Sequence, residues 1–451
     1  MGKKKNKNKL SGAVKTAAKT EKKLANKLKK ELAHLGEVNI AKVIAEIERE
    51  ESKRAAATEK TLKGPPSPRA YASLTLHPTN NELILFGGEY HDGQKTEVYN
   101  ELLFFNPANG NWKQVRAPGG PPPRSAHQAV ATPANKGELW VFGGEFTSPS
   151  ETQFHHYKDL WCFSLAEKKW EKVVAPNGPS SRSGHRMVLL GRQLLVFGGY
   201  SDDGRECRYF DDVFSFCLDT RTWSKLAPSG RGPCARSACV MLPVLIYGGF
   251  SRVREGRTER TQTHMDLFKL SVRAGAGGGG GGGGWAWRGL AGGASAPPAR
   301  AGQAGAANLH SNRGYVFGGI SVSTYLADNN IVTDEVFTMK LGGAAVAPSA
   351  PTDTLAAAGP RTGPSPRMSS MMAVQRSVLY LYGGVLERDD KQPTSNVYYY
   401  FLDLHKLHEW KTIIEQPSLP DWLGSDSDGW ESGSNSGSDG SDDTDDSEDE
   451  E

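Results

Sequence analysis

Short apolar runs that end in an aromatic residue and a pair of glycines recur six times along the chain. The runs read LILF, LWVF, LLVF, VLIY, GYVF and LYLY, and they precede Gly87-Gly88, Gly143-Gly144, Gly198-Gly199, Gly248-Gly249, Gly318-Gly319 and Gly383-Gly384. Short apolar runs bounded by turn residues are typical of buried strands. Glycine suits a strand end where φ is positive or another backbone approaches closely. The pattern therefore predicts six buried strands that end in the same way.

The other elements keep a common order around each glycine pair. An arginine comes first, an apolar strand and a turn precede the glycine-ended strand, and a polar-then-aliphatic third strand and a short fourth strand follow. The arginines are Arg69, Arg124, Arg182, Arg236, Arg300 and Arg367, and the fourth strands carry Trp112, Trp170, Trp223, Trp285 or Trp287, and Trp410. Each tryptophan offers a large flat surface for packing between repeats.

Four strands per repeat, with glycine pairs 56, 55, 50, 70 and 65 residues apart, match propeller blades of about 50 residues with loop insertions. We predict one all-β domain over residues 69–415, a six-bladed β-propeller. Its blades are expected at about 69–117, 124–175, 182–227, 236–290, 300–345 and 367–415. How the ring closes is left open, because either 60–68 or 416–424 could pair across the seam.

Two repeats depart from the common order. In the fourth, Arg236 precedes its glycine pair by 12 residues where the others need 16 to 19, so its first turn must collapse onto Leu242-Pro243. In the fifth, the first strand at 301–307 is rich in Gly and Ala, and no tryptophan follows before Arg367. Low-complexity loops interrupt the blades at 275–284 and 341–366.

The two ends of the chain carry opposite charge, although the net charge is only +3. Met1 to Lys30 holds twelve basic residues against one acid, whereas 421–451 holds thirteen acids and no Lys or Arg. Residues 1–60 are predicted to form a basic helical arm with two apolar stripes, Leu24, Leu28, Leu32 and Leu35, then Ile40, Val43, Ile44 and Ile47. This arm either folds when its stripe meets a surface or is a dedicated partner-binding segment. A Pro-rich hinge at 61–68 and a disordered acidic tail at 416–451 complete the division.

Several classes of protein are not expected from this sequence. No run of about 18 apolar residues would span a membrane, and the lysine-rich start lacks the apolar segment of a secretory signal. The five cysteines contain no CxxC pair, which favours reduced thiols in the cytoplasm or nucleus. We identify no metal-ligand spacing and no nucleotide-binding loop, so no bound metal or cofactor is expected.

This order of arginine, apolar strand, glycine pair, third strand and tryptophan resembles the kelch repeat. The resemblance implies a β-propeller that serves as a protein-binding scaffold, not an enzyme. It also implies that the arginines lie near the mouth of the central channel, where six guanidinium groups would select carboxylates or phosphates. The alternative is structural, in which each arginine bonds backbone carbonyls of the adjacent blade.

Residues beside the arginines vary between repeats. His127 and His185 follow Arg124 and Arg182 by three positions, and we expect them to form hydrogen bonds rather than bind metal, since no third ligand is spaced with them. Glu89 and Glu145 directly follow their glycine pairs and are interpreted as loop carboxylates on one face. We therefore predict a partner-binding mouth formed by Arg69, Arg124, His127, Arg182, His185, Arg236, Arg300 and Arg367.

The partner is expected to be a protein, for which an acidic segment would suit the arginines. One alternative is a nucleic-acid or ribosome-associated factor that acts through the lysine-rich arm. Another is a kelch-type enzyme of unknown reaction. In the tail, Ser425, Ser436 and Ser447 each precede an acid by three residues, a pattern suited to phosphorylation by acidophilic kinases.

Overall fold

A computed structural model of the chain describes residues 39–53, 56–92, 95–204, 206–255, 258–272, 284–290, 299–322, 330–332, 336–341, 364–387, 393–395, 399–404 and 410–414. All of these residues belong to one compact unit. The predicted first helix of the arm lies outside the described residues, as does the acidic tail with Ser425, Ser436 and Ser447.

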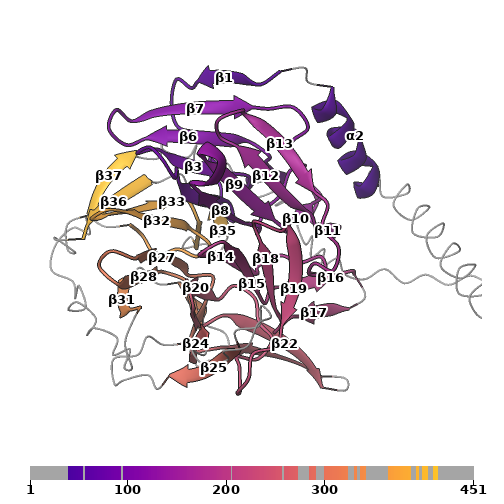
Figure 1. Cartoon of the computed structure of the whole chain (residues 1–451), viewed down its shortest axis with the longest axis vertical. Helices are drawn as coiled ribbons and strands as arrows, with labels where there is room; N and C mark the ends of the chain where they lie inside the picture. The colour runs from indigo at the N-terminus through magenta and orange to yellow at the C-terminus, as the bar shows by residue number, and fades with distance from the viewer. Residues whose placement is uncertain are drawn as a thin grey trace, which may run out of the picture. The chain divides into compact units, whose positions relative to one another are not determined.

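Each of the six repeats forms one antiparallel sheet, so the predicted six-bladed propeller is confirmed (Figure 1). From the channel outward, the first blade contains β2 (Ser73–Leu76), β3 (Leu83–Phe86), β6 (Leu102–Asn106) and β7 (Asn111–Arg116), and the second contains β8 (Gln128–Thr132), β9 (Glu138–Phe142), β12 (Leu160–Ser164) and β13 (Lys169–Val173). The third blade contains β14 (Arg186–Leu190), β15 (Gln193–Phe197), β18 (Val213–Cys217) and β19 (Thr222–Leu226), and the fourth contains β20 (Val240–Leu242), β21 (Leu245–Tyr247), β24 (Leu267–Val272) and β25 (Trp285–Leu290). The fifth blade contains β27 (Ala304–Asn308), β28 (Arg313–Phe317) and β31 (Val336–Lys340), and the sixth contains β32 (Met371–Gln375), β33 (Val378–Tyr382), β36 (Tyr399–Asp403) and β37 (Trp410–Ile414).

A two-stranded hairpin joins the second and third strands of every blade. The hairpins pair β4 (Glu89–His91) with β5 (Thr96–Val98), β10 (Glu145–Thr147) with β11 (Phe154–His156), β16 (Tyr200–Asp202) with β17 (Cys207–Tyr209), β22 (Phe250–Glu255) with β23 (Thr258–Thr263), β29 (Ile320–Val322) with β30 (Asn330–Val332), and β34 (Val385–Glu387) with β35 (Pro393–Ser395). Strand β26 (Arg300–Ala301) adds to the fifth hairpin. The short helix η1 (Ala134–Lys136) lies in the first turn of the second blade.

Tryptophans of the fourth strands pack against the preceding blade, as predicted. Trp170 lies 5.4 Å from Phe86 of the first blade, measured between ring centroids, and Trp223 lies 5.4 Å from Phe142 of the second. Trp112 makes the equivalent contact with Tyr382 of the last blade at 5.9 Å. These aromatic contacts bury the faces that a single four-stranded sheet leaves uncovered.

The glycine pairs are the corners at which neighbouring blades join. Gly87 has φ of 64°, and a Cβ atom there would lie 2.6 Å from the carbonyl oxygen of Arg124 in the next blade. The N–H of Gly88 donates to the same carbonyl at 2.9 Å. The equivalent bond from Gly384 to the Arg69 carbonyl, at 3.2 Å, joins the last blade to the first and closes the ring. Only glycine combines this backbone conformation with so close an approach.

The start of the propeller differs from the expected division of the chain. Strand β1 (Thr58–Thr61) is a fifth, outermost strand that pairs with β7 of the first blade. It therefore extends one blade and does not bridge the seam. Figure 1 shows the last blade, in yellow, beside the violet strands of the first.

The fourth and fifth blades fit each other despite their unusual sequences. The turn between β20 and β21 is shortened to Pro243 and Val244, because Leu242 pairs with Leu245. In the fifth blade, the glycine-containing strands β27 and β28 both form. A Cβ atom on Gly305 would lie 2.5 Å from Val240, and one on Gly314 would lie 2.5 Å from Leu242. The small residues of the fifth blade thus make room for the large side chains of the fourth.

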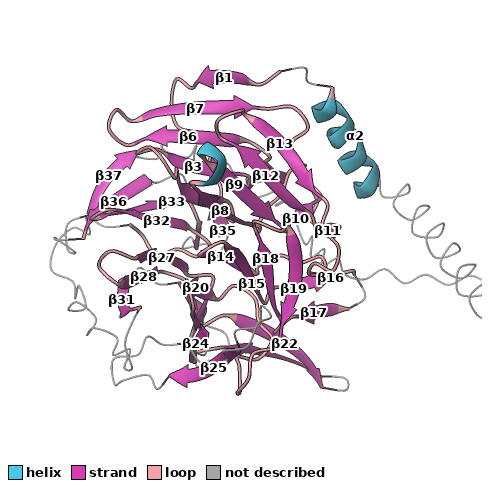
Figure 2. Cartoon of the chain, viewed as in Figure 1, coloured by secondary structure: helices cyan, strands magenta, loops and turns pink. Residues whose placement is uncertain are grey.

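Helix α2 (Ile40–Ser52) carries the second predicted apolar stripe (Figure 2). The side-chain oxygen of Asn39 caps its first turn by accepting from the backbone N–H of Ala41 at 3.0 Å. Ile44 is buried with Phe146 and Tyr157 of the second blade. The surface that the stripe covers is therefore the propeller itself. No helix among the described residues is long and apolar enough to cross a membrane.

Candidate binding site at the channel mouth

The two faces of the propeller are built differently. We call the face with the six glycine pairs and the hairpins the corner face, and the face with the turns between first and second strands the turn face. Because strands alternate in direction, the segments that lead into the first strands also lie on the corner face. Each arginine of the repeat occupies such a segment.

The six repeat arginines form what we call the arginine layer. All six side chains are fully buried, with no exposed surface: Arg69, Arg124, Arg182, Arg236, Arg300 and Arg367. In each, Nη1 donates to the carbonyl oxygen of the first glycine of its own blade, at 3.0 to 3.2 Å. The arginines therefore hold the corners of the blades from inside.

Carboxylates neutralise the arginine layer in the first four blades. The acids are Glu101 for Arg69, Asp159 for Arg124, Asp212 for Arg182 and Asp266 for Arg236. Arg124 binds Asp159 with two hydrogen bonds, at 2.8 and 3.2 Å, and its guanidinium lies 4.2 Å from the ring centroid of Tyr157. Burial opposes the charge of Asp159, but the Arg124 pair outweighs it, so the Asp159 pKa lies below its ordinary value.

A ring of backbone hydrogen bonds surrounds the channel two residues after each arginine. Its members are Tyr71, Ala126, Gly184, Ala238, Gly302 and Ser369, all with φ between 51° and 69°. The N–H of Ala126 donates to the Tyr71 carbonyl at 2.9 Å, and the N–H of Tyr71 donates to the Ser369 carbonyl at 3.3 Å. Side-chain-bearing residues rarely adopt this conformation, so the closed ring holds them there.

Both predicted histidines lie below the surface. His127 is 1% exposed, and its Nε2 lies 3.0 Å from the Ser73 hydroxyl of the preceding blade. Burial and then Arg124 lower the pKa of His127 to about 3, so its ring is neutral. His185 has no exposed surface, and burial holds its pKa well below the ordinary value. Within the described residues, no group of three or more His, Cys, Asp or Glu side chains could hold a metal ion.

The structure thus gives the mouth a different charge from the one the sequence predicted. The arginines lie inside the blades, where each donates to the carbonyl of its glycine corner, and the two histidines are buried as well. The carbonyl that each arginine side chain bonds belongs to its own blade, not to the adjacent one as in the structural alternative. Carboxylates and tyrosines line the opening instead. We call Tyr71, Glu89, Glu145, Glu151, Phe154 and Tyr200 the corner-face mouth.

The mouth opens into a channel cavity of about 520 Å³. The first residue of each inner strand forms one level of its wall, which we call the inner-strand layer: Ser73, Gln128, Arg186, Val240, Ala304 and Met371. This layer is polar in the first three blades and apolar in the last three. The residues that directly follow the glycine pairs show the same division. They are polar in the first three blades (Glu89, Glu145 and Tyr200) and apolar in the last three (Phe250, Ile320 and Val385).

A hydrogen-bond chain fixes the polar side of the mouth. The backbone N–H of Asp202 donates to Nε2 of His156 at 3.0 Å, which assigns the ring proton to Nδ1. Nδ1 lies 3.0 Å from the Ser183 hydroxyl, which donates to Glu145 at 2.9 Å. Tyr200 donates to the same carboxylate at 3.1 Å. Burial lowers the His156 pKa to about 4, so the chain joins a neutral ring to Glu145.

Two carboxylates of the mouth, Glu89 and Glu145, are protonated more readily than an ordinary glutamate. Burial raises the pKa of Glu145 and of Glu89 to about 7 each. The Ser183 hydroxyl near His156 is fully buried and already donates to Glu145, so this cluster orients a carboxylate and does not present a nucleophile at the surface. The arrangement suits recognition of a cation or a hydrogen-bond donor.

The sequence interpretation found Glu89 and Glu145 but missed Arg186 and Gln128. Both missed residues lie four positions after a repeat arginine. Comparing that position across the six repeats would have separated the polar from the apolar blades.

Comparison with known proteins agrees with this geometry. The KLHDC2/KLHL20/DRC7 Kelch-repeats domain matches residues 73–271. Human kelch domain-containing protein 3 is 26% identical over 180 residues, which cover 38% of this chain and 45% of that protein. The chain belongs to the kelch-repeat family. Acyl-CoA-binding domain-containing protein 4 of Arabidopsis thaliana is 27% identical over 45% of this chain and 29% of its own length.

One of the relatives that the chain matches is named as an enzyme. The tRNA wybutosine-synthesizing protein 2/3/4 of Oryza sativa subsp. japonica is 30% identical over 34% of this chain and 14% of its own length. The match thus spans less than half of each of these relatives. Among solved structures, YjhT covers 78% of this chain and 99% of its own with a TM-score of 0.51 and 14% identity, which supports the fold alone. Segments 77–102, 138–146 and 403–415 also resemble kelch domain-containing protein 4, a finer likeness that stays a prediction.

Proposed function

We propose that this kelch protein is a non-enzymatic scaffold that binds a partner protein at the corner-face mouth and the hairpins around it. The observation that carries the proposal is the contrast between a framework repeated six times and a mouth that differs from blade to blade. A wall that is polar on three blades and apolar on the other three admits an asymmetric partner in one orientation. Loops on a rigid scaffold are where binding residues usually lie.

The mouth offers an aromatic anchor beside carboxylates. Phe154 is 48% exposed, although its neighbours in the hairpin are partly or fully buried. Exposed aromatic residues at a concave site are frequent hot spots of protein interfaces. Glu145 and Glu151 line the same opening, and a basic group of the partner would favour the ionised form of Glu145.

The partner chemistry therefore changes from the expected acidic segment. That expectation came from six arginines at the mouth, and those arginines have no exposed surface. We propose instead that the partner presents a basic or hydrogen-bond-donating side chain to Glu145 and an apolar group to Phe154. Kelch repeats occur in relatives with very different names, so the proposal depends on this site and not on any one relative.

A photo-crosslinking residue at two positions tests the proposal. One variant carries it at Phe154 in the mouth, and the other at Leu309, which is 71% exposed in a turn on the turn face. We expect the same protein to be crosslinked in cells through position 154 and not through position 309. Equal recovery from both positions, or recovery from 309 alone, would contradict it.

The recovered partner then allows a quantitative test. Phe154→Ala should weaken binding at least about tenfold, the loss expected for an interface hot spot. Leu309→Ala is the matched control and should leave the affinity unchanged. If the crosslinked species is RNA, and deletion of residues 1–30 abolishes its binding in a salt-dependent way, the nucleic-acid alternative replaces this proposal.

A further inference from the structure

We infer that the channel cavity binds a small organic anion, whose carboxylate or phosphate group pairs with Arg186 and whose apolar body packs against the methionines beyond it. This site lies within the channel wall, and the inference stands independently of a partner protein at the mouth. It starts from one side chain that differs from all six arginines of the framework.

Arg186 is the first residue of the inner strand of the third blade. Its Nε donates to the carbonyl oxygen of Cys239 on the next blade, and its Nη1 donates to the carbonyl of His185 at 3.1 Å. Both partners are neutral backbone groups. They fix the base of the guanidinium and leave Nη2, with its two donors, for another group.

The charge of Arg186 is not neutralised by the chain that the structure describes. Its guanidinium forms no ion pair within the described residues, whereas Arg69, Arg124, Arg182 and Arg236 each pair with a carboxylate. Burial lowers the Arg186 pKa from its ordinary value, which reflects the cost of holding a cation there without a counter-charge. A bound anion would supply that counter-charge and a planar, bidentate partner.

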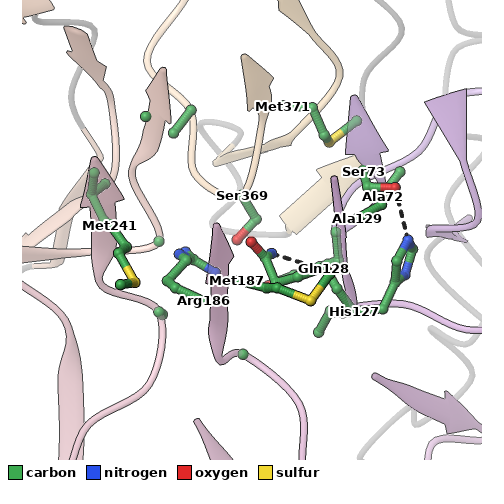
Figure 3. Close-up of a pocket in the computed structure, with 18 of the residues that line it drawn as sticks. Ala72, Ser73, His127, Gln128, Ala129, Arg186, Met187, Met241, Ser369 and Met371 are labelled. Carbon is green, nitrogen blue, oxygen red and sulfur yellow. Dashed lines mark hydrogen bonds between the residues drawn. The ribbon is translucent and has the colours of Figure 1, made fainter. Parts of the chain in front are cut away.

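The wall around Arg186 suits an anion with an apolar body. Figure 3 shows the Ser369 side chain directed toward the same part of the cavity as Arg186, where its hydroxyl would donate to a bound carboxylate or phosphate. Nε2 of Gln128, on the same wall, donates to the His127 carbonyl at 3.0 Å. Met187, the next residue of the same strand, and Met241 on the inner strand of the fourth blade also line the cavity. Methionine sulfur makes favourable contacts with aromatic rings. The cavity of about 520 Å³ has the size of small-molecule sites, and its wall combines apolar side chains with polar groups.

Comparison with the other blades shows that the propeller fold does not require a charged residue at the position of Arg186. The residues equivalent to Arg186 are Ser73, Gln128, Val240, Ala304 and Met371, none of them charged. The propeller therefore does not need an arginine at this level. Its presence in one blade only makes the site one-sided and specific for a single anionic group.

Titration calorimetry on the full chain with three matched probes tests the inference. The probes are 4-phenylbutanoate, 2-phenylethyl phosphate and the neutral 4-phenylbutanamide. We expect at least one of the two anions to bind at least about tenfold more tightly than the amide, because only the anions pair with the guanidinium. The tighter anion tells whether the natural ligand carries a carboxylate or a phosphate.

Variants locate the binding. Arg186→Met keeps the length of the side chain but removes its charge, and should weaken the tighter anion at least about tenfold. Arg186→Lys should retain part of the affinity, since a lysine keeps the charge without the bidentate geometry. Arg192→Met, at an exposed arginine paired with Asp219, is the control and should bind as the original protein does. Equal binding of amide and anions, absence of anion binding at millimolar concentration, or unchanged affinity in Arg186→Met would overturn the inference.

Discussion

The arginine layer and the inner-strand layer lie four residues apart in every repeat but follow opposite rules. In the arginine layer all six residues are identical, fully buried and bonded to a glycine corner. In the inner-strand layer the residues differ in every blade and face the channel cavity. Repetition within the chain thus marks what the ring needs in each blade. Variation at the neighbouring level marks the surface that is free to recognise something else.

The largest expected effect comes from breaking one buried pair of the arginine layer. Asp159→Asn leaves the buried Arg124 guanidinium without its counter-charge, and should lower the free energy of unfolding by about 3 kcal/mol. Urea unfolding followed by tryptophan fluorescence measures the loss. Asp219→Asn makes the same change in an exposed pair with Arg192 and should leave the midpoint unchanged. Equal loss in both variants would remove the distinction between framework and surface charges.

The glycine corner at the seam is the next target. A Cβ atom on Gly383 would lie 2.2 Å from the Arg69 carbonyl oxygen, where the last blade meets the first. Gly383→Ala should therefore destabilise the propeller by about 2 kcal/mol through strain and a displaced blade. Gly191→Ala has a similar φ of 61° with nothing within 4 Å, and should cost less. If Gly383→Ala and Gly191→Ala lower the Tm equally, the positive φ alone explains why the corner needs glycine, and the close approach of the Arg69 carbonyl does not matter.

The mouth responds to pH in a direction fixed by Glu145. Its folded pKa is raised from 4.5 to about 7, so the folded state holds a proton that the unfolded state releases. This contribution to stability is present below pH 4.5 and is lost as the pH rises through about 7. The neutral Glu145→Gln should be more stable than the original protein by about 1 to 3 kcal/mol at high pH, and by less at low pH. Urea unfolding at about pH 5 and about pH 8 checks this; a difference independent of pH would contradict it.

The smallest effect is expected at helix α2, which contacts the framework from outside. Ile44→Ser removes the buried side chain that meets Phe146 and Tyr157. Hydrogen exchange over residues 40–52 should become faster while the midpoint of global unfolding stays nearly unchanged, because the blades close without this helix. Lys42→Ser changes an exposed position of the same helix and is the control. Unaltered exchange in Ile44→Ser would show that α2 is not held by this contact, and a lowered midpoint of global unfolding would show that the blades need this helix.

The sequence predicted those parts of the fold that repeat. Apolar runs, glycine pairs and tryptophans recur with a fixed spacing, and each copy supports the same interpretation, so blade number and corner positions followed directly. Strand β1 escaped prediction because its sequence TEKT is exposed along its whole length and has no apolar alternation. It forms because β7 offers an unpaired edge, which is a property of the assembled blade.

The candidate site could be predicted only in part. The repeat located the arginines near the channel, but the depth of a side chain depends on which neighbours close over it, and the acids that cover the arginines lie 30 to 35 residues away. Arg186 lacks a motif of its own, since it stands out only when its five structural equivalents are known. Glu145 was found because it directly follows a glycine pair.

The comparison is tested most directly by two arginines of the same blade. Arg182→Met and Arg186→Met make the same chemical change four residues apart, and urea unfolding of both variants measures their free energies side by side. The account predicts a loss of about 3 to 5 kcal/mol for Arg182→Met, which removes the partner of the partly buried Asp212, and a change below about 1 kcal/mol for Arg186→Met. Equal losses in the two variants would show that Arg186 belongs to the framework, and would contradict the division on which this account depends.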